Sequence, residues 1–348
     1  MEELKLNQTP VRTSRNYNIN NIKLKNITIP EEIGSFESLE IKGKTSSTEI
    51  TEKSNNMELK YGVGIISEPN VELEIDIKES LKEPLQLAFV LSEQNKNLVE
   101  NIKINTEPEI EATIIVKYET EKNVQGFHNG IIKVNTNENS KVNVILLNLV
   151  NEQTNNFISI ENELEAQSTL KYTVVDFGGK TSITNYYSNI KGNKADSTIN
   201  TIYLGRKEQI FDLNYIGELW GEQSNLDIDV QGAIKDNAKK NFKGTIDFKR
   251  GCKKATGNEN EYCTILSDTA KSIALPMLLC EEEDVEGNHA TSAGKIGEKE
   301  LFYIMSRGFE LKEALKLMLR AKFNKVLENI PNENLKEQII NEMEVRLD

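Results

Sequence analysis

The strongest constraint on the fold is an alternation of apolar and polar residues that runs through most of the chain. From about residue 59 to residue 280, short segments of period two recur between turns rich in Gly, Asn, Asp and Lys; examples are Val71–Ile77 (VELEIDI), Thr113–Tyr118 (TIIVKY) and Lys141–Val150 (KVNVILLNLV). Such alternation, with many β-branched residues, is typical of half-buried β-strands. This part of the chain is therefore predicted to be almost entirely β.

The spacing of these segments distinguishes between two all-β architectures. Ser168, Ser197 and Ser224 begin successive strand-like segments at intervals of 29 and 27 residues. Nearly regular spacing without an exact motif favours the coils of a β-solenoid, and a large sandwich is the alternative. A sandwich normally uses tight Asn-Gly or Asp-Gly turns, and Asn129-Gly130 is the one such pair within the strand-like region. We therefore expect a solenoid.

The C-terminal part changes to a helical period. Residues 298–307 have a helical composition and Gly308 is a suitable stop, while residues 310–329 place apolar side chains three or four positions apart. Pro331 ends that segment, and residues 333–347 can form a third helix. Such an appended helical tail either binds a partner or covers the β body.

Three regions are expected from these patterns. They are a polar, partly ordered N-terminal segment (residues 1–58, with a loop over 46–58), a β-solenoid core (residues 59–297) and a helical domain (residues 298–348).

Composition restricts the function. Asp plus Glu is 55 and Lys plus Arg is 42 in 348 residues, a net charge of −13, so we expect neither a nucleic acid nor a membrane surface as partner. The start of the sequence lacks the apolar run of a secretory signal, and no apolar run approaches the ~18 residues of a membrane span. Three Cys are an odd number for a disulfide framework. Together these features lead us to expect a cytoplasmic protein.

Familiar catalytic motifs are missing from the sequence. Gly178-Gly179-Lys180-Thr181 resembles the end of a nucleotide-binding P-loop, but the Gly that this motif requires earlier is replaced by Val174, and no helical pattern follows. There is no Gly-x-Ser-x-Gly, His-Glu-x-x-His or Cys-x-x-Cys. With only His128 and His289 in the chain, His-rich zinc sites are also excluded.

One dense segment, Arg250–Lys295, concentrates the residues that bear chemistry. It holds all three Cys, a run of carboxylates and one of the two His: Cys252, Cys263, Cys280, Glu281, Glu282, Glu283, Asp284, Glu286 and His289. Thiolates suit iron and sulfur, and carboxylate and imidazole accept ferrous iron. The plainer alternatives are that the Cys are small core residues, that Cys252 is simply exposed in a turn, and that the acidic run is a solvated turn. The residues alone therefore indicate one candidate metal or sulfur locus.

The same segment carries a family resemblance. Glu281–Phe309 (EEEDVEGNHATSAGKIGEKELFYIMSRGF) resembles the C-terminal signature of the SufB/SufD family of iron–sulfur cluster assembly proteins; further matches are Phe248–Gly257, Tyr262–Asp268, Pro276–Cys280 and Leu6–Asn20. The resemblance implies a right-handed parallel β-helix with a C-terminal helical domain. It also implies a non-catalytic scaffold subunit that pairs through its β-helix with a SufB-like chain and docks one SufC-like ATPase. An iron–sulfur cluster would be held transiently at the interface, with ATPase activity expected only in the partner.

The resemblance also implies roles for single residues. His289 falls on the interface His of SufD-type subunits, a candidate cluster ligand, and Glu286 is a further candidate metal ligand in the acidic turn. SufB-type chains carry an acid after this His and a sulfur-accepting Cys at the position of Glu261; here Ala290 and Glu261 stand instead. Cys263, two residues on, shares the strand face of Glu261. Both residues are therefore candidates for the cluster or metal site. These departures favour the SufD type. The alternative is a minimal SufB-like homodimer in which Cys263 and His289 of two copies hold the cluster.

Contacts with the SufC-like ATPase are expected from the helical tail. The matching helix start and loop contain Leu301, Phe302, Tyr303, Arg307 and Gly308, and the next helix offers Leu311, Leu315 and Met318, either for the partner or for packing on the β-helix. A more distant alternative is a β-helix enzyme acting on a polysaccharide. It requires two carboxylates spaced across a groove, which the consecutive acids of Glu281–Glu286 do not supply.

Overall fold

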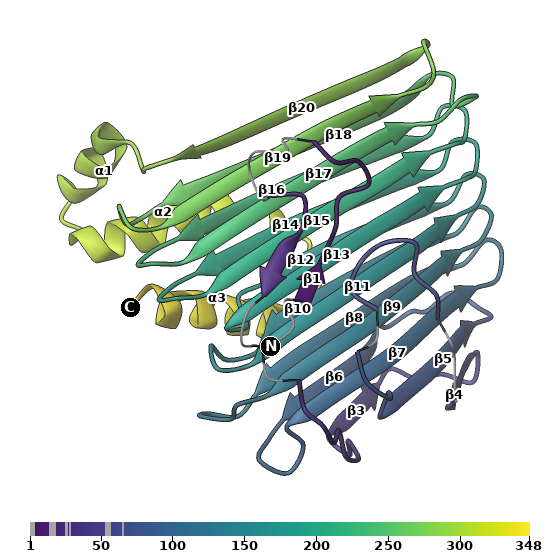
Figure 1. Ribbon diagram of the computed structural model, residues 1–348, viewed down its shortest axis with the longest axis horizontal. Coiled ribbons are helices and arrows are strands. Elements are labelled where there is room, and N and C mark those ends of the chain that lie inside the picture. The colour runs from purple at the N-terminus through teal and green to yellow at the C-terminus, as the bar shows by residue number, and fades with distance from the viewer. Residues whose placement is uncertain (1–3, 14–18, 25–26, 28, 53–56, 65) are drawn as a thin grey trace.

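The computed structural model is a β-solenoid of about eight turns followed by three helices, which confirms the predicted fold class (Figure 1). It describes the chain except for residues 1–3, 14–18, 25–26, 28, 53–56 and 65. Two nine-stranded sheets face each other, and each turn contributes one strand to each sheet. We call them sheet I and sheet II.

Sheet I begins at one end of the solenoid with β3 and finishes at the other with β20. In order along the stack it contains β3 (Leu39–Lys42), β6 (Leu85–Leu91), β8 (Glu111–Thr120), β10 (Lys141–Leu149), β12 (Thr169–Asp176), β14 (Asp196–Gly205), β16 (Asn225–Ile234), β18 (Ala255–Ile265) and β20 (Val285–Gly294).

Sheet II faces it and runs from β4 to β19. It contains β4 (Thr48–Glu52), β5 (Val71–Ile77), β7 (Asn97–Thr106), β9 (Phe127–Thr136), β11 (Asn155–Leu164), β13 (Thr181–Ile190), β15 (Ile210–Leu219), β17 (Lys239–Phe248) and β19 (Lys271–Cys280). The solenoid strands pair in parallel, but β3 and β4 are antiparallel to their neighbours and cover the first turn. The loop predicted over 46–58 is therefore wrong at Thr48–Glu52, which forms β4, and its residues 53–56 lie outside the described part of the chain.

The core lies between the sheets and is built from the inward half of each alternating strand. On β10 the inward residues are Val142, Val144 and Leu146, and they stack in register on the inward residues of β8 and β12. Each apolar side chain of this size stabilises the fold by roughly 1.5–3 kcal/mol when fully buried. The period-two pattern thus encodes one continuous core along the whole solenoid.

The turns that lead from sheet II to sheet I explain why the repeat lacks a sequence motif. Asn139, Gln167, Lys194, Gln223 and Lys254 occupy matching positions in successive turns, and all have positive φ between 57° and 59°. The amide of each donates a hydrogen bond to a carbonyl of the next turn, at 2.5–3.0 Å. The left-handed conformation strains a non-glycine residue by about 1–2 kcal/mol. Here the repeated hydrogen bond holds that conformation, so residue type varies while the backbone repeats.

The helices α1 (Glu298–Met305), α2 (Leu311–Leu327) and α3 (Glu333–Leu347) follow β20. Both α2 and α3 pack on the outer face of sheet I, where Leu319, Phe323 and Met343 meet strand residues such as Leu147 and Val175. Arg346 of α3 is buried and donates to the carbonyls of Val150 and Phe177, which fixes the end of the helix to the solenoid. No helix in the described part of the chain is long and apolar enough to cross a membrane.

The N-terminal segment lies across the outer face of sheet II. Its strands β1 (Leu4–Leu6) and β2 (Ile22–Leu24) form a short antiparallel ribbon, drawn in purple in Figure 1. Next to β1, Asn7 donates to the side chain of Asp212 at 2.6 Å, and Lys243 pairs with Asp212 at 2.5 Å, all three being buried. Polar contacts therefore hold the segment on the sheet.

Replacing Asp176 by Asn is expected to stabilise the protein at neutral pH. This inward carboxylate accepts hydrogen bonds from Asn148 and Ser182, but its burial raises its pKa from 3.8 to about 6. The folded state therefore binds a proton that the unfolded chain releases, and this contribution to stability is complete below pH ~4 and lost as the pH rises through 6. An amide at this position keeps hydrogen-bonding capacity without the charge.

Urea unfolding at several pH values measures this effect. The rise of the pKa from 3.8 to about 6 corresponds to about 3 kcal/mol in favour of Asp176→Asn at pH 7, falling towards zero near pH 4. The exposed Asp284→Asn variant serves as the control. A gain that does not change between pH 4 and pH 7 would contradict the assignment of Asp176 as the titrating group.

Candidate functional site

The two ends of the solenoid differ. At one end β3 and β4 cover the first turn, whereas at the other end β19 and β20 form the outermost edges within the described residues (Figure 1). Apart from Val285, every residue of β20 is exposed. We call this last turn the open end. It presents two ten-residue strands whose outer backbone groups pair with no described strand.

Strand alternation places three predicted candidates, Glu261, Cys263 and His289, inside the open end, together with Glu259. Glu259, Glu261 and Cys263 lie on the inner face of β18, and His289 lies on the inner face of β20. The register pairs Glu259 with His289 and pairs Cys263 with Ala293. His289 therefore lies beside Glu259, and it is offset along the strand from Cys263.

Glu261 is held in a buried ion pair. Its carboxylate accepts from Lys240 Nζ at 2.8 Å and from the Tyr203 hydroxyl at 3.0 Å, and the side chains of Glu261 and Lys240 are fully buried. The same ammonium group donates to the Ile273 carbonyl at 3.2 Å. Both hydrogen bonds reach the same oxygen of Glu261, so this oxygen has structural partners, whereas the other carboxylate oxygen is buried without one.

Cys263 is buried on the same face. Burial raises the pKa of its thiol, although Lys240 opposes that rise. Since the thiolate is the nucleophile in sulfur chemistry, a raised pKa reduces its reactivity at neutral pH. Cys263 is therefore a poor sulfur acceptor in this conformation.

Glu259 is the residue that the sequence analysis missed. Its side chain is fully buried and neither carboxylate oxygen has a hydrogen-bond partner. Burial, followed by repulsion from Glu261, raises its pKa to about 8. Counting in steps of two along Ala255–Ile265 places it on the face of Glu261 and Cys263, and this signal was present in the sequence.

The other candidates in the dense segment lie apart. Glu286 is on the outer face of β20, opposite to the face of His289, so the structure does not bring these two together. Cys280 is exposed, whereas Cys252 is buried and not exposed in its turn as one interpretation held. Burial and the nearby Glu282 raise the pKa of Cys252 to about 11. Within the described residues no group of three or more metal-ligating side chains is assembled.

The predicted partner-binding residues form an exposed surface at the helical tail. Phe302 and Tyr303 of α1 are 74% and 58% exposed, and Leu311 at the start of α2 is 50% exposed. The Arg307 guanidinium lies 5.0 Å from the centre of the Tyr303 ring. Leu301, Leu315 and Met318 are half-buried, and Gly308 has a φ of 99° between the two helices. We call the exposed part the α1–α2 surface.

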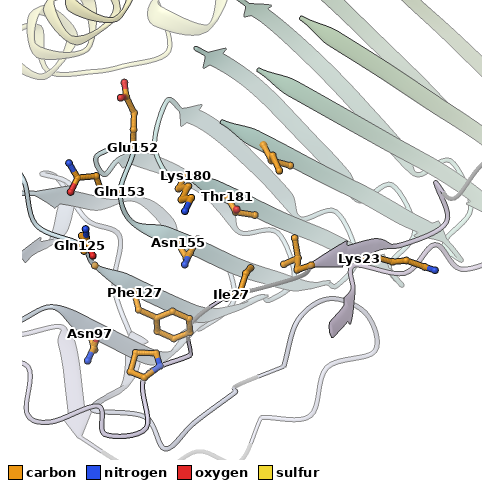
Figure 2. A pocket seen from close by; sticks show the side chains of 14 residues that line it. Lys23, Ile27, Asn97, Gln125, Phe127, Glu152, Gln153, Asn155, Lys180 and Thr181 are labelled. Atoms are coloured by element: carbon orange, nitrogen blue, oxygen red, sulfur yellow. The ribbon is translucent and has the colours of Figure 1, made fainter. Parts of the chain in front are cut away.

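A separate cavity of about 620 Å³ lies under the N-terminal segment (Figure 2). Lys180 and Thr181 of the P-loop-like sequence line it, together with Asn155 and Phe127. Thr181 begins β13 and no helix follows, which confirms that this sequence is not a P-loop. None of the predicted site residues lines this cavity.

Comparison with known proteins identifies similar chains. The family model described as "SUF system FeS cluster assembly, SufBD core domain" matches residues 89–322. "Iron-sulfur cluster assembly protein SufD" of Bacillus subtilis is 25% identical over 75% of this chain and 60% of its own length. The protein of the same name in Escherichia coli is 22% identical, over 68% of this chain and 56% of its own length.

Archaeal relatives show the same similarity. A SufBD family protein of Pyrococcus horikoshii is 28% identical over 74% of this chain and 58% of its own length. One from Methanocaldococcus jannaschii is 20% identical over 78% of this chain and 88% of its own length. The chain thus spans about three fifths of the B. subtilis and P. horikoshii proteins and most of the shorter one.

Proposed function

Because the chain belongs to the SufBD core family of SUF-system iron–sulfur cluster assembly proteins, we propose that it is a non-catalytic, SufD-type scaffold subunit. It works in the cytoplasm, pairs with a SufB-like chain and docks a SufC-like ATPase. The nascent iron–sulfur cluster is its cargo, held at the subunit interface. The observation that carries this proposal is His289, exposed on the inner face of the open end of the solenoid.

The open end supports pairing with another β-helix. The edges of β19 and β20 offer rows of backbone donors and acceptors, and natural proteins seldom leave such long edges uncovered. A partner that adds its own strands there lies directly above His289. In the proposed pair, the imidazole lies where ligands from two chains meet.

The state of Glu261 and Cys263 supports the SufD type. A sulfur acceptor needs an accessible thiolate, whereas Glu261 is bound to Lys240 and Cys263 is buried with a raised pKa. The sulfur-accepting thiol is then supplied by the SufB-like partner. The homodimeric alternative requires Cys263 to act in both copies, so it requires this buried thiol to become accessible.

The α1–α2 surface supports docking of the ATPase. Exposed aromatic side chains are common anchors of protein interfaces, and a few such anchors usually supply most of the binding energy. Phe302, at 74% exposed, contributes little to the fold of the free chain. It is therefore the side chain with which docking can be tested without unfolding the protein.

Replacing Phe302 by Asp is expected to abolish co-purification of the ATPase while leaving the melting temperature within about 2 °C of the wild type. A charge in the centre of an apolar contact typically weakens binding by about 100-fold or more. The measurement is affinity purification of the tagged chain from its host, with the ATPase identified by mass. Val345→Asp, at an exposed apolar residue of α3, is the matched control and is expected to retain the ATPase. Equal retention by both variants would place docking elsewhere.

A further inference from the structure

The cavity under the N-terminal segment is large enough for a small ligand. Its volume of about 620 Å³ lies within the usual range of ligand pockets, roughly 300–1,000 Å³ (Figure 2). Its floor is a register column on the outer face of sheet II, formed by the first residues of β9, β11, β13 and β15: Phe127, Asn155, Thr181 and Ile210. Neighbouring strands lie about 4.8 Å apart, so this floor is roughly 14 Å long.

Polar side chains of the cavity wall have no partner within the described part of the chain. Thr181 is only 6% exposed, yet its hydroxyl forms no hydrogen bond with a described residue. The same holds for the side-chain amides of Asn155, Gln125 and Gln153. Buried polar groups normally have a partner, so the Thr181 hydroxyl calls for one inside the cavity. Amides and hydroxyls both donate and accept, which suits a ligand that carries hydroxyl groups.

Lys180 adds a positive charge to this wall. Its side chain is exposed and forms no ion pair with a described residue. Glu152 is the one acidic residue in the described lining, but it is paired with Arg206 and Lys207, and Figure 2 shows its carboxylate turned away from Lys180. In a chain with a net charge of −13, such an uncompensated ammonium group is a local exception that favours an anion.

The backbone before Thr181 is fixed. Gly179 has a φ of 92°, and its carbonyl accepts from the Gln209 side chain at 2.7 Å. The Lys180 amide donates to the Thr154 carbonyl at 2.6 Å. Because this amide is already bonded, an anion here meets the Lys180 and Thr181 side chains and not a cradle of backbone amides such as a P-loop offers.

We propose that this cavity binds one small anion that carries several hydroxyl groups, a sugar phosphate. The Lys180 ammonium pairs with the phosphate and the Thr181 hydroxyl donates to it, while the amides of Asn155 and Gln153 bind the sugar hydroxyls. The site shares no residue with the open end or with the α1–α2 surface, so it does not rest on the proposed scaffold function.

The test is isothermal titration calorimetry of the full chain with glucose 6-phosphate, and with glucose and inorganic phosphate as its two halves. We expect one glucose 6-phosphate per chain and binding of each half weaker by about tenfold or more. Lys180→Met is expected to lower the affinity about tenfold and Thr181→Val about fivefold. Lys253→Met, which removes an exposed lysine from a turn at the opposite end of the sheet II strands, is the control and is expected to bind as the wild type.

Two further measurements separate lost binding from damage to the fold. Lys180 is exposed, so Lys180→Met is expected to keep the melting temperature within about 2 °C of the wild type. In the wild type, glucose 6-phosphate is expected to shift the amide NMR signals of Asn155 and Thr181 and to leave that of Lys253 unchanged. No saturable binding, unchanged affinity in Lys180→Met, an equal loss in Lys253→Met, or one half binding as tightly as glucose 6-phosphate would overturn the inference.

Discussion

Cells that carry His289→Ala as their only copy of this chain are expected to lose SUF-dependent maturation of iron–sulfur proteins. His289 is exposed, so its removal is expected to leave the fold and the α1–α2 surface intact. The loss is expected because the imidazole, on the inner face of the open end, is the cluster ligand in the proposed function. The measurement is the activity of an iron–sulfur enzyme in the host, together with iron and sulfide in the purified complex.

Asn288→Ala is the matched control for this experiment. Asn288 precedes His289 on β20 and lies on the outer face, where its side chain donates to Asn258 at 3.1 Å. We expect this variant to mature clusters normally. Normal maturation by His289→Ala would remove His289 from the site, and an equal defect in both variants would point to distortion of the edge strand.

The second large effect is expected from Lys240→Met, which should lower the free energy of unfolding by about 3–5 kcal/mol. Lys240 and Glu261 are fully buried and joined at 2.8 Å, so removing the ammonium leaves the Glu261 charge inside the core with only the Tyr203 hydroxyl. Urea denaturation measures the change. Lys239→Met, on the exposed face of the same strand, is the control and should change stability by less than about 0.5 kcal/mol.

A double variant shows whether the loss comes from the stranded charge. Lys240→Met combined with Glu261→Gln removes both charges, and we expect it to recover at least half of the stability lost in Lys240→Met. A double variant as unstable as the single one would mean that Lys240 stabilises the open end through packing alone. The charge of Glu261 would then not be the cause of the lost stability.

Much of the fold follows from residue patterns. Segments such as Lys141–Leu149 alternate because one face meets the other sheet, and this alternation predicts strands directly. The helices were located by their 3.6-residue period and by Gly308 and Pro331. The regular turn was not predictable, because positions such as Gln167 and Lys194 adopt positive φ without the glycine that usually signals it.

The candidate site was predictable only in part. Period two assigns Glu261 and Cys263 to one face, and the structure agrees. The same counting assigns Glu286 and His289, which are three residues apart, to opposite faces of a strand. It applies only if both residues are known to lie in a strand. The run of acidic residues before them is typical of a turn, so the sequence did not indicate that strand. The Glu259 carboxyl group faces Gly244 of the opposite sheet, which has no side chain to offer as a hydrogen-bond partner. No local sequence pattern encodes such a contact between sheets.

We propose that this chain is a SufD-type scaffold on which an iron–sulfur cluster is assembled. The most direct test is anoxic purification of the tagged chain from its own host, with its partners identified by mass and with iron and sulfide assayed. We expect a complex that contains a SufC-like ATPase and a distinct SufB-like chain, with iron and sulfide present. A complex of this chain with the ATPase alone, carrying iron and sulfide, would contradict the SufD-type assignment and make Cys263 the next residue to replace.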